Sequence, residues 1–182
     1  MTYRFTIISN ETDDFVREIK ISADDTFYDL HRIILSSCDY QDNQFTSFFI
    51  CNENWEQEQE ILLEDMGTSR SDEDIYLMKD TRLSDLIEEE KQRLVYVFDT
   101  LMERMFFIEL TEISFGQPME KPICSRKAGK APMQTIELEE TVQKENTKVA
   151  EELNEDFYGS EGFDDEEFDP EGFEISEGNP YA

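Results

Sequence analysis

The single histidine of the chain, His31, is the first candidate for acid–base chemistry. An unperturbed imidazole has a pKa of about 6.5 and can exchange a proton near neutral pH. His31 follows Phe27 by four residues and lies beside an apolar stripe at helical spacing. Asp29 cannot assist it, because side chains two residues apart point to different sides of a helix. We therefore interpret His31 as a hydrogen-bonded packing residue.

A second candidate, Asp99, follows the apolar run LVYVF at residues 94–98, where the chain is expected to turn. A carboxylate at a strand end could act chemically. Aspartate side chains in turns also commonly accept hydrogen bonds from backbone N–H groups. We favour the second role, in which Asp99 anchors the turn.

The sequence gives no pattern for a metal or a cofactor. Cys38, Cys51 and Cys124 form no C-x-x-C motif, and with one histidine a Cys/His zinc site is nearly excluded. We expect reduced, partly buried thiols. The run DDEEFDPEG places carboxylates at alternate positions, but Pro170 stands where a calcium loop needs glycine and Ser176 where it needs glutamate. We predict no metal site and no cofactor.

The charge balance indicates what kind of partner the chain binds. There are 45 Asp and Glu residues against 16 Lys and Arg, which gives a formal net charge of −29. Such a surface repels nucleic-acid phosphates, whose recognition requires clustered Lys and Arg. Direct nucleic-acid binding is therefore disfavoured, and a protein partner with a basic surface is expected.

Neither end of the sequence nor its interior suggests a membrane. The first residues, MTYRFTIISN, lack the basic start and long apolar run of a signal peptide. No apolar stretch approaches the roughly 20 residues needed to cross a bilayer. We expect a soluble, cytoplasmic protein with no membrane partner.

Apolar periodicity predicts the elements that would position these residues. Period-two alternation at 3–9 and 15–21 around a polar connector predicts an antiparallel hairpin. Thr26 and Asp29 form a capping box before a helix over 27–37. Residues 45–51 indicate a strand. Residues 53–67 are ambiguous and could end a short helix at Gly67, whose lack of a side chain suits a left-handed cap.

Further along, residues 68–74 are typical of a loop, 75–78 of a short strand, and the stretch RLSDLIEEE after Thr81 of a second helix. β-Branched and aromatic residues at 94–98 and 105–110 predict two central strands, joined by a turn near Asp99–Glu103. Residues 116–132 are predicted to form a loop with a basic cluster. That cluster consists of Lys121, Arg126, Lys127 and Lys130. The stretch TIELEE at 135–140 could add an edge strand or begin a helix.

These elements predict an α+β domain over residues 1–138, with a mostly antiparallel sheet packed by helices. Residues 139–182, here called the tail, have an acidic, low-complexity composition typical of disorder or docking. Aromatic residues recur in the tail at five-residue intervals, which fits neither helix nor strand: Tyr158, Phe163, Phe168 and Phe173. The tail could simply solubilise the domain, or it could dock on a basic partner or on the basic cluster of this chain.

The order of these motifs resembles the plasmid pRiA4b ORF-3-like family. FVREIKI is similar to the family's Val-Trp-Arg strand, with Arg17 at the arginine. DTFYDLHRII is similar to its Leu-x-Asp-Leu-His-x-x-Ile helix, with His31 at the histidine. LVYVFD resembles its Tyr-x-Tyr-Asp turn, at Tyr96 and Asp99. PICSRKAGKAP resembles its Pro-x-Cys loop. The resemblance covers roughly residues 3–134, and it implies an association with plasmids or other mobile elements.

The departures from the family pattern concentrate after Asp99. Leu101 and Met102 stand in place of a glycine and an aspartate. Met105 and Phe106 stand in place of a glutamate and a histidine. Side chains without a titratable proton or a lone pair cannot serve as acid, base or ligand. If the family has a polar site at this turn, this chain is expected to have lost it.

Three hypotheses for function follow from the sequence. The first is a non-enzymatic protein-interaction domain. The second is a ligand-binding or enzymatic domain with a degenerate site near Arg17, His31 and Asp99. The third is an acidic mimic of DNA, which would bind a basic DNA-binding protein.

Overall fold

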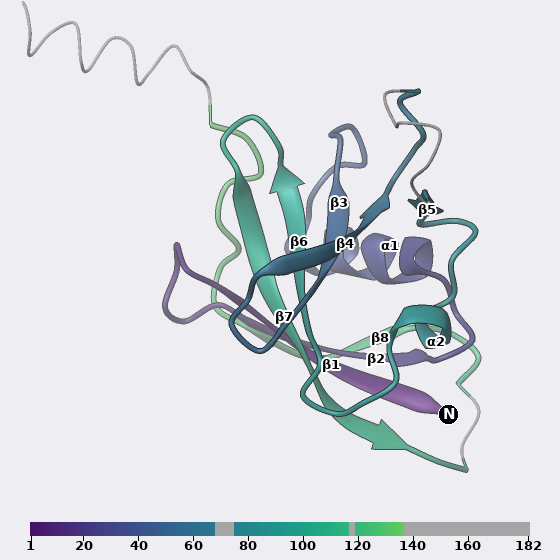
Figure 1. Ribbon diagram of the computed structural model, residues 1–182. Helices are drawn as coiled ribbons and strands as arrows, with labels where there is room; N and C mark the ends of the chain where they lie inside the picture. The colour runs from purple at the N-terminus through teal and green to yellow at the C-terminus, as the bar shows by residue number, and fades with distance from the viewer. Residues whose placement is uncertain (68–74, 117–118, 137–182) are drawn as a thin grey trace, which may run out of the picture. The chain divides into compact units, whose positions relative to one another are not determined.

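The computed structural model describes residues 1–67, 75–116 and 119–136 (Figure 1). Residues 1–136 belong to one compact unit. The predicted tail and its aromatic residues lie outside the described residues. In the described ranges, no helix is long and apolar enough to span a bilayer.

The described residues form an α+β fold around one sheet of eight strands, in the order β5-β4-β3-β6-β7-β1-β2-β8. All neighbouring strands are antiparallel except β4 and β5, which are parallel. The mostly antiparallel sheet expected from the sequence is thus confirmed. The strands are β1 (Thr2–Ser9), β2 (Val16–Ser22), β3 (Ser47–Cys51), β4 (Gln57–Leu62), β5 (Tyr76–Leu77), β6 (Arg93–Asp99), β7 (Arg104–Ser114) and β8 (Ile123–Ala128).

The predicted pair of central strands is confirmed. β6 and β7 are joined by a tight turn over residues 100–103, and both have a strand on their other side. β7 pairs with β6 from Arg104 to Glu109, next to the turn, and with β1 from Phe106 to Ser114 (Figure 1). The turn therefore stands at one end of the sheet, beside the start of β3.

Helix α1 (Phe27–Cys38) begins as the sequence predicts. The Thr26 side chain accepts a hydrogen bond from the backbone N–H of Asp29, and the Asp29 carboxylate accepts one from the backbone N–H of Thr26. Each bond satisfies a donor that the first helical turn leaves unpaired. The helix ends at Asp39, whose left-handed conformation (φ 59°) lets its N–H cap the preceding carbonyls.

The hydrophobic core lies between α1 and one face of the sheet. Alternate residues of β1, Tyr3, Phe5 and Ile7, are fully buried on this face, as period-two strands require. Helix residues Phe27, Leu30 and Ile34 cover them. Further core residues come from the other strands: Ile19, Ile21, Phe48, Ile61, Leu94, Tyr96, Phe98, Phe106, Ile108 and Leu110.

The helical interpretation of residues 53–67 is wrong. Residues 57–62 form strand β4, in which Ile61 pairs with Phe48 of β3 and is buried. Ile61 is the only residue of this stretch that enters the core. The charged residues around it therefore obscure the alternation of apolar and polar residues that would indicate a strand. Gly67 does adopt the predicted left-handed conformation (φ +66°), but it follows no helix.

The loop prediction for residues 116–132 is also wrong over part of its length. Residues 123–128 form β8, which pairs with β2 at the edge of the sheet. Arg126 and Lys127 of the basic cluster therefore lie on a strand. β8 forms because it pairs with β2, and not because its residues have a high local propensity for strands.

The second helix, α2 (Leu83–Leu86), is much shorter than RLSDLIEEE suggests.

Candidate functional site

His31 lies in the core, and its imidazole is fully buried. Its Nε2 is 3.1 Å from the carboxylate of Asp42, and its Nδ1 is 2.8 Å from the hydroxyl of Tyr96 on β6. A carboxylate only accepts hydrogen bonds, so Nε2 carries the proton. The Tyr96 hydroxyl then donates to Nδ1. Both ring nitrogens are satisfied, which confirms the interpretation of His31 as a hydrogen-bonded packing residue.

Burial determines the protonation of this group. Loss of water around the imidazole lowers the pKa of His31 below its ordinary value, and the hydrogen bond that His31 donates to Asp42 only partly opposes the shift. Burial likewise raises the pKa of the Tyr96 hydroxyl far above neutrality. His31 is therefore neutral at pH 7, and its contact with Asp42 is a hydrogen bond rather than an ion pair.

Stability is expected to fall as the pH drops below about 6.5, because the unfolded chain then binds a proton at His31 that the folded chain does not. A His31→Gln variant keeps a donor for Asp42 and an acceptor for Tyr96 but cannot titrate. We expect the loss of unfolding free energy between about pH 7 and pH 5 to be smaller in this variant, by about 1 kcal/mol. Urea unfolding at each pH measures it. Equal losses in both proteins would contradict a lowered pKa of His31.

Arg17 of β2 is also buried, with 1% of its surface exposed. All of its described hydrogen bonds go to backbone carbonyls, and its guanidinium lies 4.4 Å from the centre of the Phe15 ring. The acceptors are the carbonyls of Ser37 (3.1 Å), Val16 (2.9 Å), Ala128 (2.5 Å) and Gly129 (3.1 Å). Arg17 thus ties the last turn of α1 to the end of β8, where the negative end of the helix dipole favours a cation.

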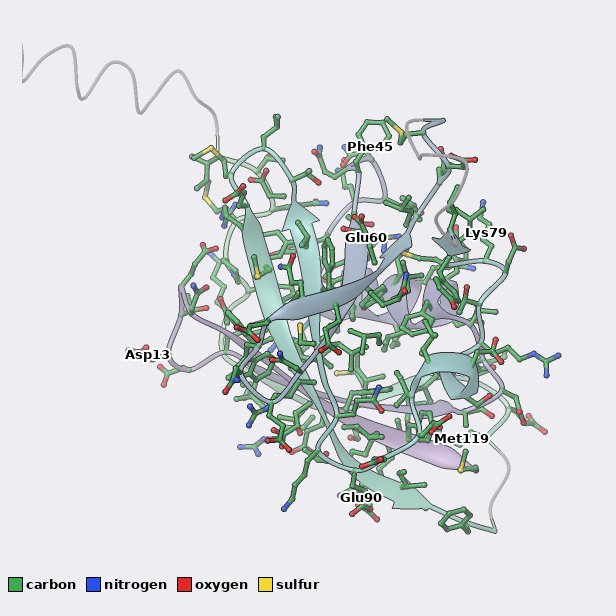
Figure 2. The ribbon with its side chains drawn as sticks, in the orientation of Figure 1. Asp13, Phe45, Glu60, Lys79, Glu90 and Met119 are labelled. Atoms are coloured by element: carbon green, nitrogen blue, oxygen red, sulfur yellow. The ribbon has the colours of Figure 1, made fainter. Side chains whose placement is uncertain are left out.

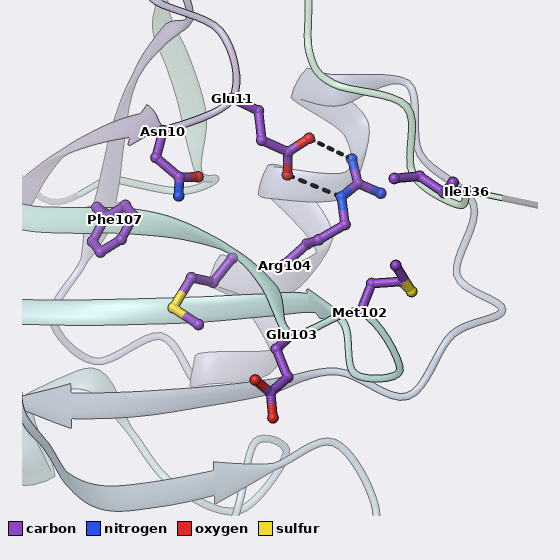
Figure 3. A pocket seen from close by; sticks show the side chains of 8 residues that line it. Asn10, Glu11, Met102, Glu103, Arg104, Phe107 and Ile136 are labelled. Carbon is purple, nitrogen blue, oxygen red and sulfur yellow. Dashed lines mark hydrogen bonds and ion pairs between the residues drawn. The ribbon is translucent and has the colours of Figure 1, made fainter. Parts of the chain in front are cut away.

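Asp99 closes the β6–β7 turn, as the sequence predicts. Its carboxylate accepts a hydrogen bond from the backbone N–H of Met102 (3.2 Å) and faces the guanidinium of Arg104 at 3.4 Å. Arg104 is 8% exposed and makes a two-pronged contact with Glu11, at 2.9 and 2.7 Å (Figure 3). These carboxylates and hydrogen bonds raise the pKa of Arg104, with the Glu11 hydrogen bonds contributing most.

Arg17, His31 and Asp99 do not gather into one site. Each is buried and bonded to its own set of partners. Asp99 lines a hollow that is lined by neither of the other two. Among the described residues, no three His, Cys, Asp or Glu side chains come together as metal ligands. The three cysteines are free, and only Cys124 is partly exposed.

Sequence reasoning missed the partners of these residues. Asp42 is eleven residues from His31, and Glu11 is 93 residues from Arg104. No local spacing connects either pair: Asp42 lies in the loop that follows α1, and Glu11 meets Arg104 only when β1 pairs with β7. Glu11 and Arg104 can both be seen in the sequence, but nothing in the sequence indicates that they pair.

Exposed apolar side chains surround the β6–β7 turn. We call Phe45, Met66, Leu101, Met102 and Ile136 the turn surface. Their exposed fractions are 61%, 55%, 85%, 40% and 39%. They line two hollows, one on each side of the turn. Large apolar side chains exposed together, rather than singly, typically mark an interaction surface.

The first hollow lies between the turn and the β1–β2 connection and has a volume of about 420 Å³ (Figure 3). Met102, Met105, Phe107 and Ile136 provide its apolar lining. The ion pair of Glu11 and Arg104 forms part of its wall. Because the Arg104 guanidinium already has carboxylate and carbonyl partners, it is not free to hold an anionic ligand.

The second hollow, which we call the Phe45 hollow, lies between the turn and the β3–β4 hairpin and measures about 480 Å³. Its apolar lining is Phe45, Leu62, Leu63, Met66 and Leu101. Figure 2 labels Phe45, beyond the start of β3, and Glu60, lower down on β4. The carboxylates of Glu60, Glu64 and Asp99 belong to the same lining, in which the described residues include no Lys or Arg.

Parts of the predicted basic cluster already have partners in the chain. The Lys127 ammonium lies 3.1 Å from the Asp39 carboxylate, and the Arg126 guanidinium lies 3.4 Å from that of Glu18. Both pairs are largely exposed, so water screens them. They still reduce the positive charge that the cluster offers to the acidic tail.

The described residues form a small α+β domain built on one mostly antiparallel sheet. The same fold occurs in MM3350, a protein of unknown function from Methanosarcina mazei Go1. Its crystal structure matches with a TM-score of 0.59 and 21% identity, covering 93% of this chain and 94% of that one. No curated protein matches the chain.

The chain belongs to the plasmid pRiA4b ORF-3-like protein family, which it matches over residues 2–177. This match confirms the resemblance found through the short motifs. It also corrects the extent of that resemblance, since the match continues beyond residue 134 and includes most of the tail.

Proposed function

We propose that this protein is a non-enzymatic interaction domain that binds a protein partner with a basic surface through the turn surface. The observation that carries the proposal is the gathering of exposed apolar side chains around the β6–β7 turn, beside exposed carboxylates. Apolar contacts would supply affinity, and opposite charge would speed and orient the encounter.

The composition of the turn surface supports this role. Met66 and Met102 belong to it, and Met105 lies in the adjoining hollow. Methionine side chains are flexible and polarisable, so they can adapt to the shape of a partner. The net charge of −29 favours a basic protein over nucleic acid.

The state of the polar candidates also favours binding over catalysis. His31 and Tyr96 use their hydrogen-bonding atoms on each other and on Asp42, away from solvent. Asp99 is engaged with the turn and with Arg104. A general acid or base must reach the proton it transfers, and a fully buried imidazole with both nitrogens hydrogen-bonded inside the protein does not meet this requirement.

The other expectations about partners stay predictions. Docking of Tyr158, Phe163, Phe168 and Phe173 concerns residues outside those described. The acidic tail would add to the attraction for a basic partner, whereas docking on the basic cluster is less favoured, because two of its four cations are already paired. A role in mobile elements rests on the resemblance alone.

Site-specific photo-crosslinking in the native host tests the proposed function. A photoreactive phenylalanine analogue at Leu101 (85% exposed) is expected to crosslink a discrete basic protein. The matched control is the same analogue at Phe115, which is 80% exposed but lies beside the cations Arg4 and Lys20. We expect the Leu101 crosslink to weaken as salt is raised, because opposite charges guide the contact.

Three outcomes would overturn this proposal. They are the same crosslinks from both positions, an acidic partner at Leu101, or no crosslinked protein from Leu101 at all. A single basic partner specific to Leu101 and sensitive to salt would support it.

A further inference from the structure

We infer that the Phe45 hollow binds a linear protein segment that carries one bulky apolar side chain flanked by Lys or Arg. The inference rests on the proposed function and names the chemistry of the partner. It is carried by the juxtaposition of an apolar hollow and unpaired carboxylates at one end of the sheet.

The hollow has the size and lining for an apolar side chain. Its volume of about 480 Å³ lies within the range typical of ligand-binding clefts. Leu62 and Leu63 are partly buried in its wall, while Phe45, Met66 and Leu101 are exposed around it. An apolar side chain entering the hollow would remove these five side chains and itself from water, which is the main source of affinity at interfaces.

The two sides of the hollow are held in place before anything binds. The hydroxyl of Thr100, in the β6–β7 turn, donates a hydrogen bond to the carbonyl of Phe45 (2.9 Å). Asp99 fixes the same turn through the Met102 N–H. Leu101 is thus presented opposite Phe45 by a braced turn, and a segment that binds there would meet less ordering cost.

The charges around the hollow select cations. Glu60 and Glu64 are exposed, and neither belongs to an ion pair in the part of the chain described here. Asp99 faces Arg104 instead. Lys79 lines an adjoining hollow, but its ammonium lies over the Tyr28 ring, 5.1 Å from the ring centre. Two carboxylates are therefore free to pair with basic residues that flank an apolar anchor.

Charge also excludes the two other occupants that the chain itself offers. A second copy would bring its own Glu60 and Glu64 and a further net charge of −29. The tail from residue 151 onwards contains no Lys or Arg, so its aromatic side chains would arrive with carboxylates on either side. Like charges brought together cost free energy, so a basic segment of another protein is favoured.

Selection from a random peptide library tests the inference. We would pan short displayed peptides on the full chain, because extended segments are a common kind of ligand for a groove. A Leu101→Glu variant serves for counter-selection. The enriched peptides are expected to share one Leu, Ile, Met, Phe or Trp with Lys or Arg nearby. Fluorescence anisotropy should then show at least about tenfold weaker binding to Leu101→Glu, as for loss of a central anchor.

Two further variants make the result specific to the hollow. Glu60→Gln with Glu64→Gln should weaken binding and reduce its dependence on salt, since the paired charges are gone. Phe115→Glu, an equally exposed apolar position elsewhere, should keep the affinity within about twofold. Circular dichroism and urea unfolding would show that all variants remain folded.

Several results would overturn the inference. They are the absence of enrichment over Leu101→Glu, peptides without a basic or an apolar consensus, or equal binding of the peptides to the unchanged protein and to Leu101→Glu. A basic partner crosslinked through Leu101 in the absence of enriched peptides would leave the proposed function standing and remove only the linear-segment inference. If neither a Leu101 crosslink nor enriched peptides were found, both the proposed function and the linear-segment inference would be overturned.

Discussion

Replacing Arg17 by methionine is expected to lower the free energy of unfolding by about 3–5 kcal/mol, a large fraction of the stability of a domain this size. The guanidinium donates to four backbone carbonyls from three segments and is 1% exposed. A methionine of similar length cannot donate, so buried carbonyls lose their partner, at about 1–3 kcal/mol each where no water replaces it. Equilibrium urea unfolding, followed by far-UV circular dichroism, measures the loss.

Arg4→Met is the matched control for this experiment. Arg4 lies on the neighbouring strand β1, but its side chain is 36% exposed and its ion pair with Glu112 (2.6 Å) faces solvent. Exposed pairs of this kind contribute at most about 1 kcal/mol. If Arg17→Met lost no more stability than Arg4→Met, the role of Arg17 as the tie between α1 and β8 would be refuted.

Replacing Phe106 by alanine is expected to cost about 3–5 kcal/mol of unfolding free energy, the usual range for a buried phenylalanine. The Phe106 ring is fully buried on β7. Its centre lies 4.8 Å from that of Phe15, in a stacked pair, and 4.5 Å from that of Phe98. Removing it would open a cavity among rings from β6, β7 and the β1–β2 connection, and thermal or urea unfolding would record the loss.

The adjacent residue provides the comparison for Phe106. Phe107 points to the opposite face of the sheet, where it is partly exposed and makes an edge-on contact with Trp55. Phe107→Ala should therefore cost clearly less. Equal losses would mean that Phe106 does not belong to the core. A folded Phe106→Ala protein of unchanged stability would reopen the possibility of a solvent-accessible site at this position of the family pattern.

Much of the fold could be predicted because several elements carry their own local signal. The capping box at Thr26 and Asp29 and the apolar stripe after Phe27 fix where α1 begins. The β-branched and aromatic residues of β6 and β7 suit no other element. β4 and β8 gave no such signal. In β8 no residue is fully buried, and the strand exists because β2 offers it hydrogen bonds.

The candidate site was less predictable, for a related reason. The roles of His31 and Asp99 followed from their local positions, and the structure bears them out. The Phe45 hollow combines residues from the start of β3, the end of β4 and the β6–β7 turn, which are up to 57 positions apart between Gln44 and Leu101. Only the pairing of β3 with β4 and with β6 brings them together.

The position of β1 within the sheet affects how the chain can fold during its synthesis. β1 lies between β2, which follows it directly, and β7, with Thr2 opposite Ser114. A ribosome must therefore release more than a hundred residues before the first strand meets its second neighbour. Until then β1 has one unpaired edge, which makes the nascent hairpin prone to pair with other chains, a circumstance in which chaperones are needed.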